Sequence, residues 1–131
     1  MQTATFIADC LKGVQIRLTG SCSGLTREQV VWRPTPRSNN IGFVLGHMAR
    51  AEDNMLSEIR ALTPLWVVDA WHERFDQPVD APDPGDRMGL RSLNIPELRV
   101  LTSYLAAVHN RSLTYLASFG EADLSVAPDP T

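Results

Sequence analysis

The stretch "NNIGFVLGHMARAEDNML", residues 39–56, decides the fold. Asn39 and Asn40 both suit the start of a helix, because an asparagine side chain accepts hydrogen bonds from the free backbone N–H groups there. Apolar residues then recur every three or four positions until Pro64 ends the pattern. The apolar stripe consists of Ile41, Val44, Leu45, Met48, Met55, Leu56, Ile59 and Leu62. This spacing predicts a long amphipathic helix with one face in a core.

Two more long helices are predicted by the same periodicity. One runs from about Thr5 to Gly20. The other begins at Asn94, with Glu97 three residues later as in a capping box, and ends at Gly120. The inner faces are Ile7, Leu11, Val14 and Leu18 in the first helix, and Leu98, Leu101, Leu105, Val108, Ser112, Tyr115 and Phe119 in the last.

Shorter elements connect these helices. Thr26 with Gln29 is a second capping-box pair, and it predicts a short helix that Pro34 ends. Residues 65–76 predict a helical turn that packs two tryptophans on the bundle, and residues 77–92 predict a loop with three prolines and two glycines. No stretch alternates β-branched and polar residues, so no sheet is expected. The prediction is a single all-α domain over residues 1–131.

An internal repeat relates the two halves of the sequence. Residues 25–36 and 119–130 both run from an apolar residue through a short acidic stretch to Pro-x-Pro, at an offset of 94 residues. At the same offset, the first helix's Ile7, Leu11 and Val14 fall on apolar residues of the last helix. Two such hairpins predict an up-down bundle of four helices, of which residues 1–131 contain three. An apolar seam would then be covered by another chain or by residues outside this range. A three-helix bundle with a tail is the alternative.

Composition excludes several classes of function. Hydrophobic residues make up 44% of the 131 and the net charge is −3, so no basic surface for nucleic acid is indicated. No apolar run is long enough for a membrane span, and the N-terminus does not resemble a signal peptide, so a cytoplasmic location is expected. Cys10 and Cys22 lack metal or redox spacing and are expected to be buried or half-buried thiols. Cys10 as a nucleophile is an alternative that no nearby motif supports.

His47 is the candidate metal ligand. On a helical projection it lies about 120° from Ile41, on the shoulder of the apolar stripe, with Ala51 and Asn54 on the same flank and Gly46 beside it. A shoulder position is where a bundle helix presents ligands to its neighbours. A hydrogen-bonded structural histidine is the alternative, since no second histidine lies three or four residues away.

The sequence also assigns positions to five other polar residues. His109 faces either the same cavity as His47 or the core, and His72 lies either at the surface or near the site. Glu52 falls within the apolar stripe and either pairs with Arg17, Arg111 or His109 or turns to solvent. Arg50 and Asp53 are expected on a solvated face. These assignments rest on helical phase alone.

The block from residue 25 to residue 56 resembles the DinB/YfiT-like (damage-inducible-protein-like) superfamily. The resemblance rests on the "Leu-Thr-x-x-Gln" turn ending at Pro34, on Asn40-Ile41-Gly42, and on "His-Met-Ala-x-x-Glu", residues 47–52. "DAWHERF" and "YLAAVHNRSLTYL", residues 69–75 and 104–116, resemble later parts of the same family.

The resemblance implies a four-helix bundle that binds a divalent metal, such as Zn, Ni or Fe, through three histidines. His47 matches the ligand on the second helix, whereas the family's His-x-x-x-His pair on the fourth helix has no counterpart in residues 1–131. One imidazole does not hold a metal by itself. Some relatives are metal-dependent transferases or isomerases that use small thiols, so a transferase or hydrolase is one expectation. The other is a non-enzymatic module that forms a homodimer, or binds a partner helix, through its open seam.

Overall fold

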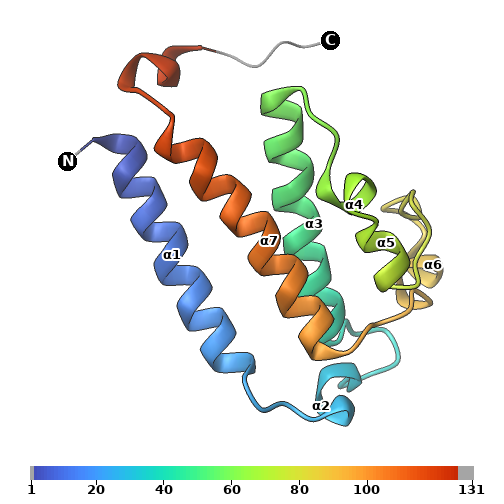
Figure 1. Ribbon diagram of the computed structural model, residues 1–131. Helices are drawn as coiled ribbons and strands as arrows, with labels where there is room; N and C mark the ends of the chain where they lie inside the picture. The colour runs from blue at the N-terminus through green and yellow to red at the C-terminus, as the bar shows by residue number, and fades with distance from the viewer. Residues whose placement is uncertain (1, 127–131) are drawn as a thin grey trace.

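The computed structural model describes residues 2–126, and within that range the chain forms helices and no strand. Three helices of 20 residues each build the bundle: α1 (Thr3–Cys22), α3 (Ile41–Arg60) and α7 (Leu98–Ala117). Helix α7 lies between α1 and α3 and packs against both (Figure 1). The all-α helical bundle predicted from the sequence is therefore confirmed. None of the described helices combines the length and apolar character that crossing a membrane requires.

An aromatic cluster forms the centre of the core between α3, α7 and the segment that connects them. Trp66, Trp71 and Phe75 each place their ring 5.2–5.6 Å from the ring of Tyr104, and all four side chains are buried. The centroid distances and tilted or edge-on geometries are those that aromatic pairs prefer. The buried aliphatic residues packed around them include Leu45, Leu101, Leu105 and Val108. The two tryptophans thus pack on the bundle as predicted.

The predicted helix starts of the first half are confirmed. In α2 (Arg27–Val31), Thr26 and Gln29 form both bonds of a capping box. Asn40 caps α3 by accepting a hydrogen bond from the N–H of Phe43 at 2.7 Å. Helix α3 ends at Arg60, and the capping residue Ala61, three residues before Pro64, has a φ of 52° in the left-handed region.

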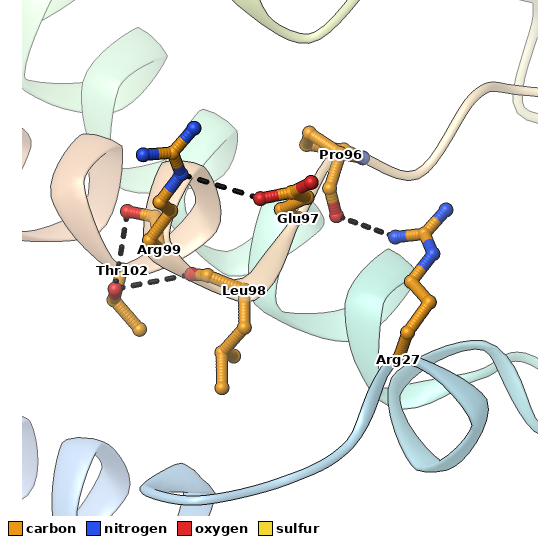
Figure 2. A network of polar contacts seen from close by, with 6 residues as sticks. All are labelled: Arg27, Pro96, Glu97, Leu98, Arg99 and Thr102. Carbon is orange, nitrogen blue, oxygen red and sulfur yellow. Dashed lines mark hydrogen bonds and ion pairs between the residues drawn. The ribbon is translucent and has the colours of Figure 1, made fainter.

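The start of α7 differs from the prediction. The helix begins at Leu98 rather than at Asn94, because Pro96 disfavours helical geometry in the residue before it. Asn94 instead donates its side-chain N–H to the carbonyl of Phe75 at 2.8 Å. The guanidinium of Arg27 in α2 donates to the carbonyl of Pro96 at 2.8 Å, and this bond ties α2 to the entrance of α7 (Figure 2).

The connection from α3 to α7 contains three short helices: α4 (Leu65–Val68), α5 (Trp71–Arg74) and α6 (Arg87–Arg91). The first two confirm the predicted helical turn. The third lies inside the predicted loop, where Asp86 starts it by accepting a hydrogen bond from the N–H of Gly89 at 2.9 Å. We call residues 61–97 the crossover.

The positions of the elements agree with the internal repeat. Adding 94 to the bounds of α2 gives 121–125, which are the bounds of the 3-10 helix η1 (Glu121–Ser125). The N–H of Gly120 donates to Asp123 at 2.7 Å, as the N–H of Thr26 donates to Gln29 at 2.9 Å, at the same offset. The second Pro-x-Pro lies outside the described residues.

Apolar side chains predicted to face inward on α1 and α3 are instead exposed. In α3 only Leu45 and Leu56 of the predicted stripe are buried, and Met55 is 61% exposed. In α1 the side chain of Val14 is 46% exposed. We call these exposed residues the apolar seam: Ile7 and Val14 of α1, and Ile41, Val44, Met48, Met55 and Ile59 of α3. Their exposure agrees with the open seam that the repeat predicted.

Candidate functional site

His47 lies in the first half of α3, at the edge between the apolar seam and the crossover. Its ring is exposed and stacks almost parallel on Phe43, with centroids 5.7 Å apart and planes 7° apart. Phe43 lies one turn earlier on the same face. On the seam side, Val44 is also exposed. The shoulder position predicted for His47 is therefore observed.

Two glycines allow the crossover to approach α3 closely beside His47. A Cβ atom added at Gly42 would lie 2.3 Å from Cγ2 of Ile95, and one added at Gly46 would lie 3.4 Å from Cε2 of Phe75. The two glycines are four residues apart and share one face of α3. The crossover residues packed over this face form the walls of a cavity.

The inner cavity has a volume of about 320 Å³ and lies between α3, the crossover and the start of α7. This volume is at the lower end of the usual range for small-molecule sites. The residues that line it are Gly42, Phe43, Gly46, His47, Arg50, Ala51, Asn54, Phe75, Gln77, Ala81, Leu90, Leu93, Ile95, Pro96 and Leu101. Most of these are apolar, and none is acidic.

An outer cavity of about 480 Å³ adjoins the inner one. Its lining is Arg37, Asn39, Phe43, His47, Ala81, Pro82, Pro84, Arg87, Leu90 and Arg91. The two cavities share Phe43 and His47 on α3 and Ala81 and Leu90 on the crossover. The stacked rings of α3 therefore stand where the two cavities meet.

Arg50 is the cationic residue of the inner cavity. Its guanidinium carbon lies 4.0 Å from the ring centre of Trp66, and its Nε atom is buried without a hydrogen-bond partner in the described structure. Burial lowers the pKa of this guanidinium, although Asp53 and Asp80 act on it in the opposite direction. The prediction that Arg50 lies on a solvated face is wrong, because this flank of α3 faces the crossover.

Asp53 is a second correction, since its side chain is only 1% exposed. Its carboxylate accepts hydrogen bonds from the N–H groups of Leu65 and Trp66, each at 2.9 Å, and from the hydroxyl of Tyr104 at 2.6 Å. Burial raises the pKa of Tyr104, and the hydrogen bond to Asp53 raises it further, so this hydroxyl remains a donor. Asp53 thus connects α3 to α4 and α7 through hydrogen bonds, and it does not line the inner cavity.

The remaining candidate residues do not assemble around His47. Glu52 accepts a hydrogen bond from the hydroxyl of Ser112 at 2.9 Å, so the pairing with Arg17, Arg111 or His109, one of its two alternatives, is not observed. Arg111 instead donates to Ser57 at 2.5 Å.

His109 is buried in the core of α7, with Nε2 lacking a hydrogen-bond partner among the described residues. His72 is half-buried, with its ring 6.3 Å from that of Trp66. The sequence left open whether His109 faces the cavity beside His47 or the core, and the structure places it in the core.

Neither cysteine belongs to the site. Cys22 is buried, as expected, whereas Cys10 is exposed, so the prediction of a buried or half-buried Cys10 is wrong. Within residues 2–126, no three His, Cys, Asp or Glu side chains are grouped so as to hold a metal ion. His47 by itself does not fit a metal centre, which needs three or four ligands.

Helical phase missed the role of Arg50 and Asp53, although the sequence contained one signal. Arg50 follows Gly46 by four residues, so both lie on the side of α3 that the crossover covers. A charged residue on a face that also carries glycines indicates close packing rather than solvent. The identity of the covering segment could not be inferred from this pattern.

Comparisons with known proteins agree with this architecture. The solved structure described as "Crystal structure of the conserved protein of locus from Enterococcus faecalis" superimposes with a TM-score of 0.83 at 24% sequence identity. The match covers 95% of this chain and 75% of the other, and at this identity it shows the fold alone. Comparison with curated proteins gives no match. The family model described as DinB superfamily matches residues 11–131, and the chain therefore belongs to the DinB superfamily.

Proposed function

We propose that this chain binds a small molecule in the paired cavities beside His47 and that His47 is one ligand of a divalent metal. The observation that supports this most is the position of His47, which lines both cavities and also borders the apolar seam. A side chain in this position reaches a bound molecule on one side and a helix packed on the seam on the other. Zn, Ni and Fe are the candidate metals that the family resemblance implies.

The other metal ligands must come from outside the described residues, because within residues 2–126 no three His, Cys, Asp or Glu side chains are grouped so as to hold a metal. A helix packed on the open faces of α1 and α3 would pass beside His47. This chain covers 75% of the solved relative, which is longer. Metal binding is thus proposed for an assembly in which the seam is covered.

The reaction class proposed is the transfer or isomerisation of a small substrate with a low-molecular-weight thiol, as the family resemblance implies, and hydrolysis is the alternative chemistry. An apolar cavity of about 320 Å³ supports a small substrate rather than a polymer. A cytoplasmic location is proposed with it, supported by the two free cysteines, one of them exposed.

The metal proposal is tested by calorimetric titration of the longest expressed form with Zn²⁺ and with Ni²⁺. We expect binding of one metal per site, an increase in melting temperature, and loss of both in His47→Asn. His72→Asn is the matched control, because His72 lines neither cavity, and this variant should bind the metal normally. A protein that neither binds these metals nor gains stability from them would contradict the proposal.

A non-enzymatic function is the second candidate, and the apolar seam is the observation that favours it. In this alternative, a second copy of the chain covers the seam and forms a homodimer. Light scattering should then give the mass of a dimer, and Met55→Glu should give a monomer. Met88→Glu is the control, because Met88 is 76% exposed on α6, off the seam. A stable wild-type monomer would end this proposal.

A further inference from the structure

The charged side chains that line the two cavities are all arginines, although Asp53 and Asp80 act on Arg50 from outside the lining. The chain carries a net charge of −3, yet the lining of the cavities includes four arginines and no aspartate or glutamate. Arg37, Arg87 and Arg91 line the outer cavity, and Arg50 lines the inner one. Among residues 2–126 the one ion pair joins Arg99 and Glu97, so none of the four is neutralised by a salt bridge.

Arg50 is the residue best placed to bind an anion. Its guanidinium carbon lies 4.0 Å from the ring centre of the buried Trp66, a cation–π contact with a rigid ring. The guanidinium is partly desolvated, and its buried Nε lacks an acceptor within the described structure. A buried donor without an acceptor is costly, and a ligand oxygen would remove that cost. The carboxylate of Asp53, which acts electrostatically on Arg50, already accepts three hydrogen bonds from other groups.

The rest of the inner cavity selects for an apolar body. Phe75, Leu90, Leu93, Ile95 and Leu101 line it, and besides Arg50 its polar side chains are those of His47, Asn54 and Gln77. Gln77 already donates to the carbonyl of Asn94 at 2.6 Å. A ligand that fills this space therefore needs an uncharged apolar part and one charged group directed at Arg50.

We infer that the paired cavities bind a small organic carboxylate, with its apolar part in the inner cavity and its carboxylate paired with Arg50. A carboxylate fits because the planar guanidinium fork matches its two oxygens. The arginines of the outer cavity attract the anion toward the mouth, an effect that salt screens. The inference uses the site of the proposed function and assigns its ligand class without involving the metal.

The test compares three probes that separate charge from apolar area. The probes are 3-phenylpropionate, the uncharged 3-phenylpropan-1-ol, and acetate, which has the charge without the ring. Binding is measured by NMR titration of the full chain after treatment with a chelating resin, so that no metal takes part. We expect 3-phenylpropionate to bind at least about tenfold more tightly than either other probe, which corresponds to about 1.4 kcal/mol. Amides around the inner cavity should shift during the titration.

Variants identify the residue responsible. Arg50→Gln should remove the preference for 3-phenylpropionate over the alcohol, whereas Arg60→Gln, at the far end of α3 and stacked on Tyr115, should keep it. Asp80→Asn should tighten binding of the carboxylate, because Asp80 acts on Arg50.

Equal affinities for the acid and the alcohol in the wild-type protein would overturn the inference, as would equal affinities for 3-phenylpropionate and acetate. The wild-type comparison remains decisive even if Arg50→Gln does not fold. Because the assay is free of metal and leaves His47 intact, its failure is separate from failure of metal binding.

Discussion

Replacement of Asp53 should destabilise the fold strongly. The carboxylate accepts three hydrogen bonds at 2.6–2.9 Å while only 1% exposed, so its removal leaves two backbone N–H groups and the Tyr104 hydroxyl without an acceptor. An unsatisfied buried donor costs about 1–3 kcal/mol. Asp53→Asn retains one oxygen but directs an NH₂ group toward a donor, so we expect a loss of about 2 kcal/mol. For Asp53→Ala we expect about 4 kcal/mol, by analogy with broken buried pairs.

Urea denaturation followed by circular dichroism measures these losses. A domain of this size is stable by about 5–15 kcal/mol, so both variants should still fold at low temperature. Glu58→Gln is the matched control, because Glu58 is an exposed acid on the same helix and should change stability by less than about 0.5 kcal/mol. An Asp53→Ala variant that loses no more than the control would refute the view that Asp53 holds the crossover on α3.

Two further predictions concern packing and pH. Gly42→Ala should lower the free energy of unfolding by about 1–3 kcal/mol, because the added Cβ would lie 2.3 Å from Ile95. Gly20→Ala, which has open space around it in α1, should instead raise the free energy of unfolding by about 0.5–1 kcal/mol. Equal effects of the two substitutions in denaturant unfolding would contradict the close approach at Gly42. The raised pKa of Tyr104 means that stability falls as pH rises above the ordinary tyrosine value of 10.0, because there only the unfolded state releases this proton. Tyr104→Phe should make the free energy of unfolding fall less steeply with pH above pH 10, by up to about 1.4 kcal/mol per pH unit. The same pH dependence in the variant and the wild-type protein would argue against the buried hydrogen bond.

Local signals predicted much of the fold. The caps at Thr26 and Asn40 place α2 and α3 because they satisfy backbone groups within a few residues. Similar signals failed where a local competitor was overlooked. Pro96 prevents a helix start at Asn94, and Asp86 starts α6 inside a stretch rich in proline and glycine.

The candidate site could be predicted only in part. The phase of α3 placed His47 on a shoulder, and the structure agrees. The cavities could not be predicted, because they depend on where the crossover packs, and that is a tertiary contact between residues far apart in sequence. The same contact turned two expected surface residues inward: Arg50 is half-buried with a buried Nε atom, and Asp53 is fully buried.

The most direct test of the central proposal is crystallographic. Crystals of the longest expressed form, grown with Zn²⁺, are measured at the zinc absorption edge. The account predicts an anomalous peak about 2.0–2.1 Å from an imidazole nitrogen of His47, next to the inner cavity. A peak that avoids His47, or a fully zinc-equilibrated crystal with no peak, would contradict it.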